Sequence, residues 1–201
     1  MSNPYSKTDK VINAINRRIV IEFGIMRSRL VFDELTIMKL IKNLYEQLYE
    51  EVKEFYMALI KSEYYNQTDS VLEELKLENL LKGVLQGYNP VTLYVFENEF
   101  SRKAERLIEA LLGDWANKDT IIDKHMKYLA RQIAQGAITA RDDSVKQAYE
   151  DLGITKVIWQ TAEDEKVCSH CNELDGRVYD ISKVPDKPHF NCRCIILPYE
   201  E

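Results

Sequence analysis

Apolar residues recur every three or four positions along most of this chain, which is the spacing of amphipathic α-helices. The clearest stretch begins after Asp33 and continues for about thirty residues, with lysine and glutamate on its other face. Its apolar members are Ile37, Leu40, Ile41, Leu44, Tyr45, Leu48, Tyr49, Val52, Phe55, Tyr56, Leu59 and Ile60. The pattern predicts one long helix whose broad face is buried in a helical bundle.

The same spacing predicts further helices on either side of this one. Residues 6–32 fit a helix, although their apolar positions are broadly spread and include the β-branched run Ile19-Val20-Ile21. The remaining predicted helices are 71–85 with a stop at Gly87, 93–113 after a restart at Asn89-Pro90, 119–135, and 137–152 with a stop at Gly153. Gly136 is interpreted as the junction between the last two.

After Gly153 the pattern changes to short β-rich runs. Strands are predicted at 155–161, 177–179 and 193–197, with Trp159 packing the small sheet against the preceding helix. A sheet of this size buries too little surface to be stable alone, so it needs a cross-link. The predicted fold is mainly α, with a helical body at 1–136 and a small α+β module at 137–201 that includes a lead-in helix and needs such a cross-link.

All four cysteines lie in the predicted module. Cys168-x2-Cys171 is followed by seventeen residues and then by His189-x2-Cys192-x-Cys194. Two such groups at the ends of a loop are typical of a tetrahedral zinc site. There are five candidates for four places: Cys192 and Cys194 both face the metal from one side of a strand, or His189 replaces one of them.

The other histidine of this region, His170, lies between the first two cysteines and is expected to point away from the metal. Four protein ligands leave no position for water, so the zinc is predicted to be structural. The alternatives are four reduced cysteines without a metal, or a disulfide.

Composition narrows the range of functions. The net charge of −6 and the pI of about 5.3 provide no overall attraction to nucleic acid. The polar amino terminus does not resemble a secretory signal, and no run approaches a membrane span, so a reducing cytosol is expected.

No arrangement of residues indicates catalysis. An HNH-type nuclease needs a histidine with a second histidine or asparagine around a metal, and His189 and Asn191 are near each other, but the cysteines compete for the same place. His170 beside Cys171 offers a thiol and a histidine, but clustered cysteines more often share a metal. Neither glycine-rich phosphate motif is present. The chain is expected not to be an enzyme.

The module carries a specific combined motif. It consists of Trp159-Gln160-Thr161, an acidic turn at Glu163 and Asp164, the first cysteine pair, Leu174-Asp175-Gly176, and Pro188-His189-Phe190-Asn191-Cys192-Arg193-Cys194. Over about residues 137–199 this resembles the carboxyl-terminal signature of phage head morphogenesis proteins, the Mu F-like minor head proteins. Phe190 stands where that family usually has proline.

The resemblance implies a minor head protein that joins the procapsid near the portal and acts in head assembly or in handling packaged DNA. Its partners would be the portal protein, the major capsid protein or both, with no membrane and no small-molecule substrate. Its location would be the host cytoplasm during assembly and then the virion head. The sequence leaves open its copy number, its docking surface and whether it touches DNA.

Two further alternatives remain at this point. The cysteines also fit a zinc-ribbon module that acts as a nucleic-acid-binding or regulatory protein. The tyrosines of the long helix fit either the core or a docking surface, with the core favoured: Tyr45, Tyr49, Tyr56, Tyr64 and Tyr65.

Overall fold

The computed structural model of the chain describes residues 6–85, 96–162, 167–190 and 192–200. Some positions named above lie outside these ranges: Gly87, Asn89, Pro90, Glu163, Asp164 and Asn191. The described chain is mainly helical and has a small three-stranded sheet near its carboxyl end, as predicted.

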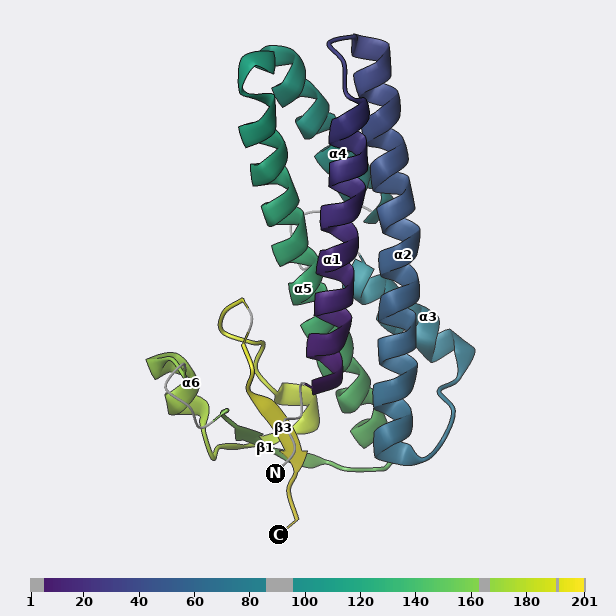
Figure 1. Cartoon of the computed structure of the whole chain (residues 1–201). Coiled ribbons are helices and arrows are strands. Elements are labelled where there is room, and N and C mark those ends of the chain that lie inside the picture. The colour runs from purple at the N-terminus through teal and green to yellow at the C-terminus, as the bar shows by residue number, and fades with distance from the viewer. Residues whose placement is uncertain (1–5, 86–95, 163–166, 191, 201) are drawn as a thin grey trace.

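Five helices form the body of the molecule. They are α1 (Ser6–Arg29), α2 (Glu34–Thr68), α3 (Glu74–Leu85), α4 (Phe96–Gly113) and α5 (Lys118–Asp151), and the 3-10 turn η1 (Trp115–Asn117) joins the last two. Helices α1, α2, α4 and α5 run side by side as a bundle, and the sheet lies at one end of it (Figure 1). Among the described residues, no helix has both the length and the apolar character that crossing a bilayer requires.

Helix α2 confirms the clearest prediction from the sequence. It begins after Asp33, whose extended backbone lets its carboxylate accept a hydrogen bond from the Thr36 N–H at 2.8 Å. It ends where Asp69 turns into the left-handed region with φ of 52° and donates its N–H to the carbonyl of Tyr65. Both ends of the helix are therefore capped by residues of the chain itself.

The burial of the tyrosines of α2 distinguishes between a role in the core and a role on a docking surface. Tyr45, Tyr56 and Tyr64 are buried, and Tyr49 packs partly buried against the same core. Only Tyr65, which is 53 % exposed, faces outward. The tyrosine-rich face is thus mainly core, as favoured.

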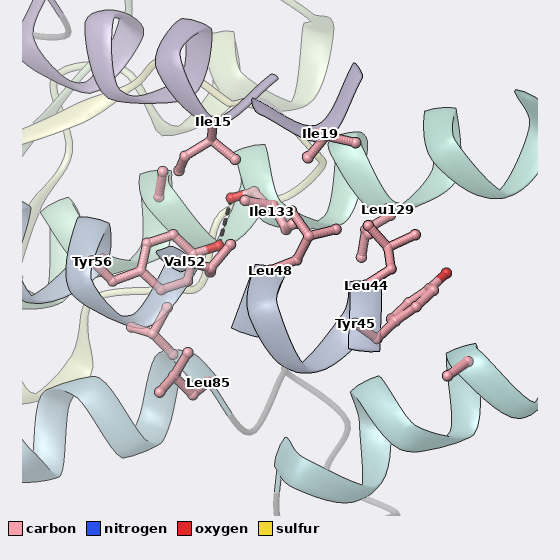
Figure 2. Close-up of a cluster of buried hydrophobic side chains, with 14 of the residues drawn as sticks. Ile15, Ile19, Leu44, Tyr45, Leu48, Val52, Tyr56, Leu85, Leu129 and Ile133 are labelled. Carbon is pink, nitrogen blue, oxygen red and sulfur yellow. Dashed lines mark hydrogen bonds between the residues drawn. The ribbon is translucent and has the colours of Figure 1, made fainter. Parts of the chain in front are cut away.

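The predicted helix break at Gly136 is wrong. Helix α5 passes through this position without interruption. A side chain here would lie 2.2 Å from the hydroxyl of Tyr56, and that hydroxyl donates a 2.6 Å hydrogen bond to the carbonyl of Ile133 (Figure 2). Gly136 therefore gives Tyr56 room to reach the backbone of α5, and the predicted boundary between body and module falls within one continuous helix.

The end of α5 does occur at the predicted glycine. Gly153 has φ of 75°, its N–H bonds to the carbonyl of Glu150, and the N–H of Ile154 bonds to that of Tyr149. This pair of bonds is a Schellman motif, which requires the left-handed conformation that glycine adopts without strain. The turn leads the chain directly into the sheet.

The sheet has the antiparallel order β2-β1-β3, with β1 at Lys156–Gln160, β2 at Val178–Asp180 and β3 at Ile195–Pro198. The third strand starts two residues later than predicted, so Cys192 and Cys194 do not lie on one side of a strand. The cause is that the carbonyl of Cys194 accepts from the Lys187 ammonium, and pairing with β1 begins only with Ile195 opposite Gln160.

Two side chains of β1 share a face but pack against different neighbours. Val157 packs with Val145 and Tyr149 of α5. Trp159, predicted to pack the sheet against this helix, instead lies among the buried cysteines. A single strand therefore links the helical bundle to the cysteine cluster.

We predict that Gly136→Ala lowers the free energy of unfolding by about 1–2 kcal/mol, measured by urea denaturation. The added methyl group must displace Tyr56 and weaken its bond to Ile133, and this cost exceeds the gain in helix propensity.

Gly24→Ala is the matched control, because Gly24 also lies within a helix but has open space where the methyl group would go. It should raise stability by about 0.5–1 kcal/mol. Equal stabilisation by both substitutions would contradict the role assigned to Gly136.

Candidate metal centre

The first cysteine pair is formed by the short helix α6 (Ser169–Leu174), which follows β1. Cys168 precedes the helix, and its sulfur accepts the N–H of Cys171 at 3.4 Å. This N–H···S contact is the support that a metal-bound thiolate receives in a Cys-x2-Cys turn. His170, expected to point away, is exposed and belongs to neither group of candidate ligands.

A hydrogen-bonded turn fixes α6 relative to the sheet. The Asp175 carboxylate accepts the N–H of Thr161 at 2.7 Å, and Gly176, with φ of 70°, donates its N–H to the carbonyl of Trp159. The interpretation of Asp175-Gly176 as a tight turn fits these bonds. They bring Cys171 back over the buried face of β1.

The segment after β2 and the 3-10 turn η2 (Ile181–Lys183) brings the other three candidates to Cys171. The Cys171 sulfur lies 3.2 Å from Nε2 of His189 and 3.7 Å from the sulfur of Cys192. Ligand atoms lie within 4.8 Å of one another in two groups, Cys168 with Cys171 and His189, and Cys171 with Cys192 and Cys194. Cys171 is common to both groups.

The distance between the Cys171 and Cys192 sulfurs is compatible with both atoms binding one tetrahedral metal ion. In a tetrahedral site with Zn–S bonds of about 2.3 Å, two sulfurs stand about 3.8 Å apart. The separation of Cys171 and Cys192 is close to this value at 3.7 Å. The group of residues could therefore hold a metal ion, and which four of the five donors bind it stays a prediction.

The buried thiols are costly to ionise unless a positive charge lies close to them. Burial raises the pKa of Cys171 and of Cys192, because a thiolate there loses its hydration. Hydrogen bonds from the backbone, first that of Cys171, lower the pKa of Cys168. A metal ion would supply the positive charge that several adjoining thiolates need.

Lys187 connects this cluster to the helical bundle. Its ammonium donates to the carbonyl oxygen of Cys194, forms a 3.2 Å ion pair with Asp142 of α5, and lies 5.3 Å from the centre of the Trp159 ring. Its charge also acts to lower the pKa of Cys192, against the larger effect of burial. No spacing rule in the sequence pointed to Lys187, because its partners lie on α5 and in the cysteine loop.

The same loop touches α5 at a second point. The guanidinium of Arg131 lies 5.1 Å from the centre of the Phe190 ring, a cation–π distance. Phe190 is the residue that departs from the usual motif, and its ring gives Arg131 a partner that proline would not provide.

The sequence of this module resembles that of a known protein family. Residues 102–197 match the sequence model of the family described as Phage Mu protein F like protein. This part of the chain is similar to that family. The resemblance inferred from the cysteine motif is thus confirmed, and the match extends beyond the module to helices α4 and α5.

The chain is also similar to an uncharacterized protein of Haemophilus influenzae, with 32 % identity over 105 residues. The alignment covers 46 % of this chain and 23 % of that protein, so the chain spans about a quarter of its relative. No solved structure matches the chain.

We predict that Cys171→Ser lowers zinc affinity at least about 100-fold, because Cys171 is shared by both groups of candidate ligands. In hydrogen exchange, the amides of β1–β3 should lose protection while those of α1, α2 and α4 keep it. His170→Asn is the matched control and should change neither measurement, since His170 is exposed and outside the cluster. Retained protection of the sheet in metal-free Cys171→Ser would refute a structural role for the metal.

We also predict that Lys187→Met lowers zinc affinity about 10- to 100-fold, as loss of a residue that supports the ligands does. The substitution leaves the Cys194 carbonyl without its cation, and it leaves Asp142 with only its ion pair to Arg141. Lys183→Met removes only an exposed ion pair with Asp180 and should leave the affinity unchanged. Equal affinities for the two variants would show that the bridge does not support the site.

Proposed function

We propose that this chain is a structural protein of a phage head and acts during head morphogenesis near the portal. The observation that carries the proposal is the Mu F-like match over residues 102–197. The matched residues contain every candidate metal ligand and also α5, the helix on which the module packs. Family and site therefore concern the same structural unit.

The proposed role of the metal is to hold the module folded. Cys171, Cys192 and Cys194 are buried, and five candidate donors exceed the four that zinc needs. If four of these donors bound one ion, no position would be left for water or substrate, so we propose a structural zinc ion and a protein that is not an enzyme.

The proposed partners are the portal protein, the major capsid protein or both. The chain would meet them in the host cytoplasm during assembly and remain in the virion head. The net charge of −6 argues against a body that binds DNA by general electrostatic attraction. A zinc module that binds nucleic acid is the alternative class, and the following test separates it from the first.

We expect the protein to sediment with heads or proheads in a gradient of lysate from phage-producing cells, followed by immunoblot. Treating half of the sample with nuclease should not change this, because the contacts proposed are with protein. Sedimentation at the top of the gradient would contradict the head assignment. Co-sedimentation that nuclease abolishes would favour the nucleic-acid module instead.

A lysate of a phage mutant that lacks the portal protein distinguishes docking to the portal from docking to the shell. If the portal is the docking partner, the empty shells should lack this chain while the parent proheads contain it. Equal amounts in both kinds of particle would assign the docking to the shell.

A further inference from the structure

A groove of about 420 Å³ lies between α1 and α2 on the outside of the bundle, away from the cysteine module. Figure 1 shows these two helices adjacent along one face. Arg17 and Ile21 line the groove from α1, and Glu54 and Phe55 line it from α2. The groove lies outside the Mu F-like residues 102–197.

Helix α1 has apolar residues on two faces. Ile15, Ile19, Phe23 and Met26 are buried against the bundle. Val20, Ile21 and Ile25 remain 57 %, 52 % and 41 % exposed, and the last two are four residues apart on the side of the groove. The two apolar faces explain why the apolar spacing of this segment is broad. The exposed apolar residues are more than packing within the chain requires.

The inner charges of the groove are already paired. Arg18 donates to the Glu51 carboxylate at 2.8–3.0 Å and forms a 2.9 Å ion pair with Glu22. These contacts join α1 to α2 and fix the distance between the two walls. They leave no charge on Arg18 or Glu51 that needs another partner.

The outer charges of the groove are different. Arg17 and Glu54 are both exposed, and neither side chain forms a hydrogen bond or ion pair with another residue in the ranges that the structure describes. They carry opposite charges and stand on opposite walls, with Ile21 and Phe55 in the same groove. The surface therefore contains a cation, an anion and an apolar centre.

Opposite charges on the two walls allow two copies of this surface to pair with each other. In a twofold symmetric contact, residue i of one copy meets residue j of the other, and j meets i. We propose that this groove is the interface between two copies of the chain, with Arg17 of each copy paired to Glu54 of the other and Ile21 and Phe55 packed between them. The inference does not depend on the proposed head function, and either can fail without the other.

The test is sedimentation velocity of the full chain, with zinc present, over a series of protein concentrations. The parent should dimerise reversibly. Arg17→Glu and Glu54→Arg should each raise the dissociation constant about tenfold or more, because symmetry makes each substitution set like charges against each other twice. The double variant Arg17→Glu/Glu54→Arg should return to within about threefold of the parent, because both pairs are restored in reverse.

Two further variants test the apolar centre and the specificity of the charges. Ile21→Lys should abolish the dimer. Lys42→Glu reverses a charge on the exposed opposite side of α2 and should leave the dissociation constant unchanged. Circular dichroism and urea midpoints equal to those of the parent would show that each variant is folded, as expected for exposed positions.

A parent that is monomeric at every concentration would overturn the proposal. So would a dimer that Ile21→Lys leaves intact, or one that the double variant does not restore, since the dimer would then use another surface.

Discussion

The structure depends on the continuity of α5. Its carboxyl-terminal half supplies Ala137, Ala140 and Ala148 to the core of the bundle, and Val145 and Tyr149 to the small cluster under the sheet. One rigid helix thus serves as a wall of both packing units, and the small sheet inherits its position from the bundle. Tyr56 packs against Gly136 in the middle of α5, and this contact sets how closely α2 and α5 approach each other.

What the bundle cannot supply is a core for the module itself. The three strands have five, three and four residues, and the buried side chains around them fall into two small clusters, one on α5 and one made of Trp159 and three cysteines. The second cluster is made of thiol groups where a larger domain would have aliphatic side chains. Such a cluster gains little from burial alone, whereas metal bonds across it would supply the missing stabilisation. Lys187 fits this arrangement, because it holds the loop of the second cluster to the helix of the first.

The sequence was sufficient for whatever depends on local pattern. The helices, the stop at Gly153 and the convergence of Cys168, Cys171 and the later ligands follow from periodicity, turn chemistry and spacing. The errors concern contacts between distant segments. A glycine at position 136 is compatible with a helix end and with a close contact inside a helix. The contact with Tyr56, eighty residues away in the sequence, shows that the second applies. Lys187 was missed because its partners, Asp142 and the Cys194 carbonyl, follow no spacing pattern that the sequence alone reveals.

The family match and the packing both treat α5 and the small sheet together, whereas the division predicted at residue 136 stays a prediction. The Mu F-like match begins at residue 102, inside α4, and so includes the whole of α5 together with the module that rests on it. Helices α1, α2 and α3 lie outside the match and contribute the buried faces that complete the bundle. The exposed isoleucines of α1 and the charged groove beside them lie outside the matched residues, on a side of the bundle where a contact can form without disturbing the cysteine cluster.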